Sequence, residues 1–188
     1  MAKEGKYAQY VTPFYRALTE YGDMTDAYQG SVVNPPLFFD PSIYKGDKPA
    51  NMWVEVLHTY APGGSFGTPL MPQMASGHKH EFDEVFIFLG SNPDDITDLG
   101  GTVETWLGEG DEAEKFMLTK STCVYIPAGV PHSTTVYREV KNPDQPILLV
   151  VVAMKGDYQL EEQNTKLPTG FVQGAVADRS KSRGGSQK

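Results

Sequence analysis

The fold is decided by one stretch of the sequence, Gly-His-Lys-His-Glu-Phe-Asp-Glu-Val-Phe-Ile-Phe at residues 77–88. On an extended strand, successive side chains point to opposite faces, so residues of the same parity share a face. His78, His80 and Glu84 have the same parity and would share one face of such a strand. On an α-helix, residues two apart do not face each other, and the two histidines would point apart. The run after Glu84 is β-branched and aromatic, which also favours a strand.

Two imidazoles and a carboxylate on one face are typical of a metal site. A second stretch, Pro-Ala-Gly-Val-Pro-His at residues 127–132, predicts a tight turn that aims His132 into a barrel. A lone His-x-His pair is weak evidence, but this chain has only four histidines and three of them lie in these two stretches. We therefore expect His78, His80, Glu84 and His132 to bind one divalent transition metal. Iron, manganese, nickel and zinc all remain open.

Apolar side chains would surround this metal. Phe82, Phe86 and Phe88 have the same parity as the ligands, and we expect them to line a substrate pocket. His58 lies in another predicted strand, at residues 52–60, and is a candidate for the same pocket. The alternative for His58, which we favour, is an ordinary hydrogen-bonded histidine near a strand end.

The opposite face of the ligand strand is apolar as well, because it carries Val85, Ile87 and Leu89. An apolar outer face indicates cover by a second layer or by another subunit.

The two stretches resemble the paired motifs of the cupin superfamily. The first family motif reads G-x5-H-x-H-x3-E-x6-G, and the second reads G-x5-P-x-G-x2-H-x3-N. The matching positions are His78, His80, Glu84, Pro127, Gly129 and His132. The resemblance covers about residues 52–154 and implies a three-histidine, one-glutamate metal site inside a jelly-roll barrel of six to eight strands. It also implies pairing of two barrels, and because the apolar outer face agrees with this, we expect a homodimer.

The chain departs from the family pattern at four turn positions. Pro72 stands where the first motif has its leading glycine, and the closing glycine comes one residue early, at Gly90. The second motif opens with Ser121, and Val136 stands where the family often has asparagine. These departures bear on the shapes of loops more than on the ligands.

The surrounding sequence predicts an all-β fold. Short runs rich in Val, Ile, Thr, Tyr and Phe are separated by Gly, Pro, Asn and Asp. The predicted strands are residues 52–60, 84–89, 102–107, 114–118, 122–126, 133–140 and 147–154. Strands at this spacing favour an antiparallel sandwich or barrel. Residues 91–101 predict a loop, and the glycine-rich residues 63–67 predict a turn.

We expect three regions along the chain: an N-terminal extension at 1–30, the barrel at 31–155 and a C-terminal extension at 156–188. Thr12 followed by Pro13 is typical of a helix start and predicts a short helix over residues 13–21. The tail over residues 179–188 contains no apolar residue, and we expect it to be mobile.

Composition narrows the partners. A net charge of −8 argues against nucleic acid and anionic membranes as partners, and the expected partner is the small-molecule substrate of the apolar pocket. The single cysteine, Cys123, cannot form an internal disulfide, which fits a reducing compartment. No run resembles a secretory signal or approaches the roughly 20 apolar residues of a membrane helix. We expect a cytoplasmic protein.

Five further side chains have structural interpretations that we favour over functional ones. Cys123 is expected to be a buried structural thiol. Tyr125 and Tyr137 are expected to pack in the core or at an interface. Arg138 and Lys79 are expected at solvated strand positions rather than on a substrate carboxylate.

The favoured function is a metal-dependent enzyme that acts on a small, partly apolar organic molecule, with dioxygenase-type oxidation as its chemistry. One alternative is a lyase or isomerase that uses the metal only as a Lewis acid. Another is a non-catalytic module that binds or senses a small molecule, because a fold hosts many functions. No general base stands out by its spacing, and the catalytic residues therefore stay unassigned.

Overall fold

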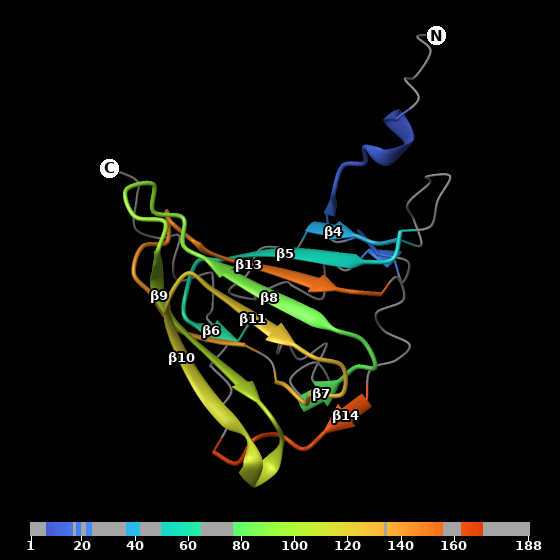
Figure 1. Ribbon diagram of the computed structural model, residues 1–188. Helices are drawn as coiled ribbons and strands as arrows, with labels where there is room; N and C mark the ends of the chain where they lie inside the picture. The colour runs from blue at the N-terminus through green and yellow to red at the C-terminus, as the bar shows by residue number, and fades with distance from the viewer. Residues whose placement is uncertain are drawn as a thin grey trace.

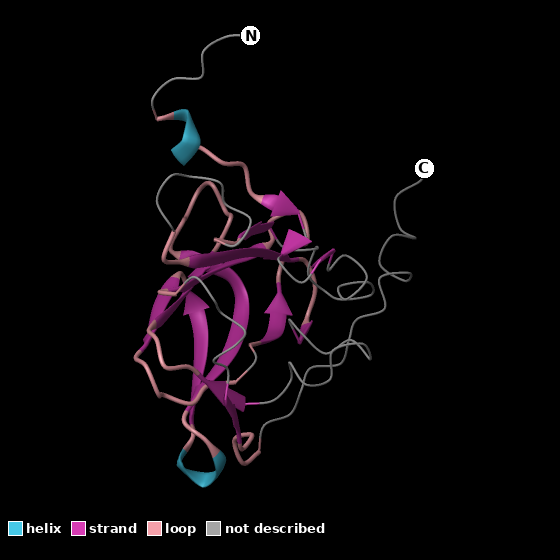
Figure 2. Ribbon diagram, turned by 90° about the vertical axis from the view of Figure 1, so that its right-hand side faces the viewer, coloured by secondary structure: helices cyan, strands magenta, loops and turns pink. Residues whose placement is uncertain are grey.

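The computed structural model describes residues 7–16, 18–19, 22–23, 37–41, 50–64, 77–133, 135–155 and 163–170. Over these ranges the chain is β-structure with two short 3-10 helices, Ala8–Tyr10 and Gly110–Glu112, and no α-helix. Two antiparallel sheets curve around a common core (Figures 1 and 2). In the described part of the chain, no helix has the length and apolar character needed to cross a membrane.

The first sheet has six strands in the order β1-β4-β5-β13-β8-β11. Every neighbouring pair in it is antiparallel. Its strands are β1 (Tyr15–Arg16), β4 (Leu37–Phe39), β5 (Trp53–Thr59), β8 (Glu84–Leu89), β11 (Thr122–Ile126) and β13 (Ile147–Ala153).

The second sheet has four strands in the order β10-β9-β12-β6. Its strands are β6 (Gly63–Gly64), β9 (Asp98–Leu107), β10 (Glu114–Lys120) and β12 (Val136–Val140). Two small pairs complete the described structure. They join β14 (Gln163–Thr165) to β7 (Gly77–Lys79) and β2 (Leu18–Thr19) to β3 (Gly22–Asp23).

The connections between the sheets identify the fold. The chain passes from one sheet to the other at each step through β5, β6, β8, β9, β10, β11, β12 and β13, except at the β9–β10 hairpin. If these eight strands are counted in chain order, the first sheet holds strands 1, 8, 3 and 6 side by side. The other sheet holds strands 2, 7, 4 and 5. This is the connectivity of a double-sheet jelly roll, so the predicted all-β jelly-roll fold is confirmed.

Alternating burial shows which side chains face the core. Residues of β5 and of β13 alternate strictly between buried and half-buried, which is the pattern of a strand with one covered face. The buried apolar residues form two clusters, and the larger one lies between the sheets. Its members are Leu57, Phe86, Phe88, Leu99, Val103, Ile126, Tyr137, Ile147, Leu149 and Val151.

Two predictions about glycine-rich segments were wrong in part, although residues 91–97 do form a loop as expected. Residues 98–101 belong to β9 rather than to the preceding loop, and Gly63 and Gly64 form β6 rather than a turn. A Cβ on Gly101 would lie 2.1 Å from the carbonyl oxygen of Glu139, and one on Gly90 would lie 1.8 Å from that of Asp98. These glycines therefore mark close approaches between backbones.

The helix predicted over residues 13–21 was also wrong wherever that segment is described. Residues 15–16 and 18–19 form β1 and β2, and β1 pairs with β4. Pairing with a strand of the barrel thus overrides the local helix-start signal. The tail over 179–188 lies outside the described residues, and the region boundaries at 31 and 155 stay predictions.

Candidate metal centre

Backbone hydrogen bonds bring the two motifs together. The His78 N–H donates to the carbonyl oxygen of His132 at 2.9 Å, and the His132 N–H donates to that of His78 at 2.8 Å. The Gly129 N–H donates to the carbonyl oxygen of His80 at 2.7 Å. The turn that carries His132 is therefore fixed against the segment that carries His78 and His80. Glu84 follows as the first residue of β8.

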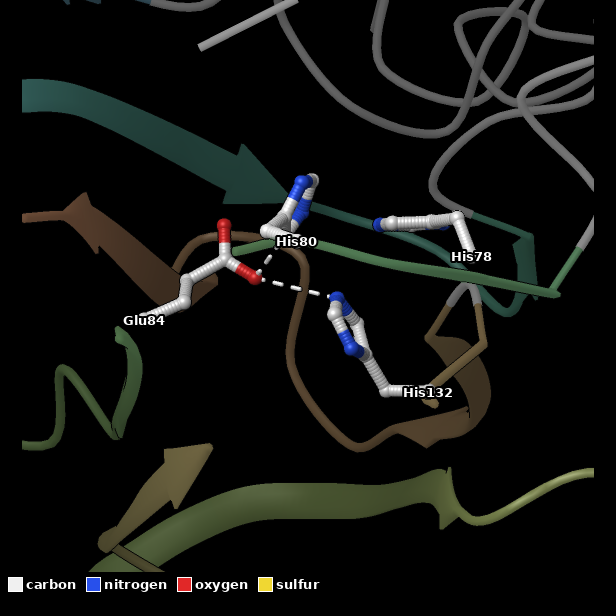
Figure 3. A group of neighbouring side chains, drawn as sticks. All are labelled: His78, His80, Glu84 and His132. Atoms are coloured by element: carbon white, nitrogen blue, oxygen red, sulfur yellow. Dashed lines mark ion pairs between the residues drawn. The ribbon is translucent and has the colours of Figure 1, made fainter. Parts of the chain in front are cut away.

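All four predicted ligands meet at one point (Figure 3). One nitrogen of each histidine and one carboxylate oxygen of Glu84 lie within 4.8 Å of one another. His80, Glu84 and His132 are buried, and His78 is half-buried. Ligand bonds of about 2 Å allow separations of up to about 4 Å between ligand atoms, so small side-chain rotations would complete a metal shell.

The arrangement of lone pairs fits a cation at this point. The carbonyl oxygen of Val130 lies 3.1 Å from His132 Nδ1. A carbonyl oxygen only accepts, so Nδ1 carries the proton and the Nε2 of a neutral ring keeps its lone pair. That Nε2 lies 3.0 Å from Glu84 Oε2, yet neither atom makes a hydrogen bond of ordinary geometry within the described residues. A shared cation would relieve the repulsion between them.

His80 is prepared for the same role. Burial lowers the pKa of His80 to about 4, although the nearby Glu84 carboxylate opposes this shift. The imidazole is therefore uncharged at neutral pH, which is the form that binds a metal. Its Nε2 lies 3.7 Å from Glu84 Oε2.

The three predicted pocket phenylalanines are buried on the ligand side of the sheet. The ring of Phe82 stacks on His80, with centroids 4.6 Å apart and planes 14° apart. The ring of Phe86 meets His132 edge-on, with centroids 5.7 Å apart. Phe88 lies farther from the histidines, in the apolar cluster between the sheets. Phe82 and Phe86 therefore hold imidazole rings as well as limiting the access of water.

His58 does not join them, and its assignment to the pocket is corrected. It pairs with Leu148, which pairs with Leu89 on β8. Directly paired residues share a face, and Leu89 has the opposite parity to Glu84. His58 is therefore half-buried on the outer face of the sheet.

Other expectations were partly wrong. Cys123 is exposed rather than buried, because it lies on the outward side of the edge strand β11. Tyr137 is in the core as expected, whereas Tyr125 is largely exposed. Arg138 lies at a half-exposed strand position, and its Nε also pairs with Glu104 Oε2 at 2.9 Å. Lys79 is half-buried.

Asp83 was missed as a positioning residue. Its carboxylate accepts a hydrogen bond from the Tyr125 hydroxyl and another, at 2.9 Å, from the Ala128 N–H. These bonds, and the Tyr125 bond most of all, hold the pKa of Asp83 below its usual value. The sequence around Asp83 does not reveal its partner, because Tyr125 lies 42 residues farther along the chain.

Comparisons with known proteins are distant. No family model matches the chain, and no curated protein matches its sequence. It is similar to oxalate decarboxylase from Bacillus subtilis, at 12% identity and a TM-score of 0.42, over 69% of this chain and 27% of that one. It is also similar to vicilin from Corylus avellana (hazelnut), at 11% identity and a TM-score of 0.44, over 69% of this chain and 31% of that one. A third similar structure is hydroxypropylphosphonic acid epoxidase from S. wedmorenis, at 14% identity and a TM-score of 0.34, over 54% of this chain and 42% of that one.

This chain spans less than half the length of each of these chains. The fold assignment therefore rests on the strand connectivity and on the motif residues themselves. Because the eight barrel strands follow the jelly-roll order and the four predicted ligands gather at one point, the chain has the double-sheet jelly-roll fold that the resemblance of its two motifs implies.

Proposed function

We propose that the chain is a metal-dependent enzyme that oxidises a small, partly apolar organic molecule with dioxygen. The observation that carries the proposal is the convergence of three imidazoles and one carboxylate within 4.8 Å, inside a barrel lined with phenylalanine. Four ligands leave positions open on a metal that prefers five or six. When bound, the metal would supply Lewis acidity and, in the case of iron, reactivity toward dioxygen.

The residues of the chain would prepare this chemistry in three ways. The Val130 carbonyl fixes the tautomer of His132, and burial keeps His80 uncharged. Phe82 and Phe86 pack against the imidazoles and keep water from the ligands. Glu84 supplies the negative charge that offsets part of the charge of a divalent cation. The apolar side chains favour an apolar substrate body.

The first test is the metal content of protein purified without oxygen. We expect about one equivalent of metal, lost in His80→Ala and kept in the matched control His58→Ala, whose imidazole lies on the outer face. Iron together with oxygen consumption on catechols or diketones would support the proposal. Zinc, manganese or nickel without oxygen consumption would favour the lyase or isomerase alternative.

Two outcomes would contradict an enzyme of either kind. An unchanged metal content in His80→Ala would show that His80 does not bind the metal, and would contradict the proposed metal centre. Tight binding of a small molecule with no turnover under any metal would leave the binding or sensing alternative.

We also propose that the chain forms a homodimer through the outer face of its first sheet. That face carries half-buried apolar residues where a solvent-facing sheet would alternate with polar ones. They are Val54, Val56, Val85, Ile87, Leu148, Val150 and Val152. We expect a species of about twice the 20.7 kDa chain mass, dissociated by Val150→Glu. A single 20.7 kDa species for the wild type would contradict the dimer.

A further inference from the structure

We propose that the barrel interior contains a second polar site, formed by Thr59, Tyr137 and Glu55, that binds a hydroxyl group at the end of the substrate away from the metal. The ligand class is a small molecule with an apolar body, a metal-binding oxygen at one end and a hydroxyl at the other. This inference rests on the proposed function, because it assigns the polar end of the same substrate.

Strand register places the three side chains inside the barrel. Glu55 and Thr59 are buried residues of β5 and alternate with the half-buried residues of its outer face. Tyr137 pairs with Val103 across the second sheet and belongs to the apolar cluster between the sheets. Thr59 is 0% exposed, Tyr137 1% and Glu55 5%. Two hydroxyls and a carboxylate buried together are unusual in a hydrophobic core, where apolar side chains are the norm.

Both hydroxyls have hydrogen-bonding capacity to spare. Thr59 Oγ1 and the Tyr137 hydroxyl oxygen are fully buried and lie close enough for the Thr59 hydroxyl to act on the pKa of Tyr137, but neither makes a hydrogen bond of ordinary geometry within the described residues. Buried polar atoms in native proteins are nearly always satisfied, and exceptions point to a role beyond folding. A polar group of a ligand would satisfy both hydroxyls.

The chemistry of the cluster selects a hydroxyl group. Burial raises the pKa of Tyr137 well above its usual value; the Thr59 hydroxyl opposes this shift and the Glu55 carboxylate adds to it. Tyr137 therefore stays protonated and donates. The carboxylate of Glu55 accepts when ionised, and the Thr59 hydroxyl does either. A ligand hydroxyl both donates and accepts, so it matches this set.

The spacing between the two sites suits a small molecule. Glu84 lies level with Trp53 across β13, and Glu55 is two residues farther along β5. Strand spacings of about 4.8 Å and rises of about 3.4 Å per residue put the Cα atoms of Glu84 and Glu55 about 12 Å apart. Phe86 and Val151 occupy the same level as Glu55 and would contact the apolar body of the ligand.

A third buried hydroxyl lies between the two sites. Thr105 is on β9, between Val103, which pairs with Tyr137, and Leu107, which bridges to His132. Its Oγ1 also makes no hydrogen bond within the described residues. Polar groups thus continue along the inside of the second sheet from the metal ligands to Tyr137.

The test compares two rigid probes on zinc-loaded protein, where no redox turnover interferes. The probes are 4-hydroxybenzoate and benzoate, which differ only in the hydroxyl opposite the carboxylate. We expect 4-hydroxybenzoate to bind about five- to tenfold more tightly by calorimetry. Tyr137→Phe and Thr59→Val should each reduce this preference, and Tyr137→Phe should bring it close to one. The control Tyr7→Phe, at an exposed residue outside the barrel, should keep it.

Equal affinities in the wild type, a preference unchanged in Tyr137→Phe, or no binding of either probe would overturn the second site. A second readout needs no ligand. Replacing an unsatisfied hydroxyl by an apolar group should leave the melting temperature of Tyr137→Phe and Thr59→Val unchanged or raised. A clear fall in both would show that the hydroxyls hold the core together, which would also overturn the inference.

The metal-free protein separates this inference from the proposed function. A preference for the hydroxylated probe that depends on Tyr137, in a protein that binds no metal, would support the polar site while contradicting the metal-dependent enzyme. One equivalent of bound metal with no preference between the two probes would support the metal centre and contradict the polar site.

Discussion

The hydroxyl of Tyr125 donates a hydrogen bond to the carboxylate of Asp83, which lies 42 residues earlier in the chain. The same carboxylate accepts from the Ala128 N–H in the turn that leads to His132. Asp83 precedes the ligand Glu84 directly. The carboxylate of one half-buried residue therefore joins the end of the first motif to the beginning of the second.

Removing this carboxylate should loosen the metal centre without removing a ligand. We expect Asp83→Ala to weaken metal affinity about tenfold, since groups that orient ligands have effects of that order. The measurement is competition with a chromogenic chelator. The matched control is Asp94→Ala, at an exposed loop residue away from the centre. Equal losses in the two variants would show that the contact with the second motif has no role in metal binding.

Neutralising Glu84 should have opposite effects with and without metal. In the metal-free protein, Glu84→Gln replaces a buried carboxylate by an amide that can donate to His132 Nε2, now 3.0 Å from Oε2. We expect this variant to be more stable than the wild type by about 1–2 kcal/mol without metal. With saturating zinc it should be less stable, because its affinity is lower. Thermal unfolding in chelator and in zinc checks both signs, and a shift of the same sign in both conditions contradicts the prediction.

The pair of Glu104 and Arg138 should stabilise the second sheet. Glu104 is buried and accepts from Arg138 Nε at 2.9 Å, Arg138 Nη2 at 3.0 Å and Trp106 Nε1 at 2.7 Å. We expect Arg138→Ala to lower the free energy of unfolding by about 2–3 kcal/mol, because it leaves a buried carboxylate without its cation. Urea titration measures this change.

A double variant tests whether the loss comes from the stranded charge. Arg138→Met with Glu104→Met should recover much of the stability, because no buried charge then remains. If the double variant is no more stable than Arg138→Ala, the effect comes from lost packing instead.

The same carboxylate should make stability depend on pH. Burial by itself would raise the pKa of Glu104, but the hydrogen bonds from Arg138 and Trp106 outweigh it and hold the pKa below its usual value. Between the folded pKa and the unfolded value of about 4.3, the unfolded chain binds more protons, so stability rises with pH there. The contribution is complete above the unfolded value and is lost as pH falls through the folded pKa.

The measurement is the free energy of unfolding from pH 7 to pH 3 for the wild type and Glu104→Gln. The difference between them should shrink as the pH falls below about 4.3. A difference that is constant across this range would assign the acid sensitivity to other groups.

Several elements were predictable because one local pattern determined them. The bounds of β8 and β11 agree with the sequence prediction, since each is a short apolar run ended by turn residues. The meeting of His78, His80, Glu84 and His132 followed from parity and from the resemblance of the two motifs. For these four residues, strand parity and the family motifs predict the same metal site.

Other features depend on tertiary contacts that the sequence does not display. In β5 the inward residues include Glu55 and Thr59, whereas the outward ones include two valines, so hydrophobicity could not tell which face His58 takes. The pairing of Glu104 with Arg138 joins strands β9 and β12, whose register was not known beforehand. Cys123 is exposed because β11 is the edge strand of its sheet.

The reciprocal backbone hydrogen bonds between His78 and His132 have a consequence for the order of folding. Three ligands lie within a few residues of one another, and an unfolded chain can offer them to a metal together. His132 arrives only when a long loop closes and the barrel strands pair, which is a slow event in a topology of high contact order. Metal added early in refolding would then be held first by an incomplete shell, and the rate at which the fourth ligand arrives would report the closing of the barrel.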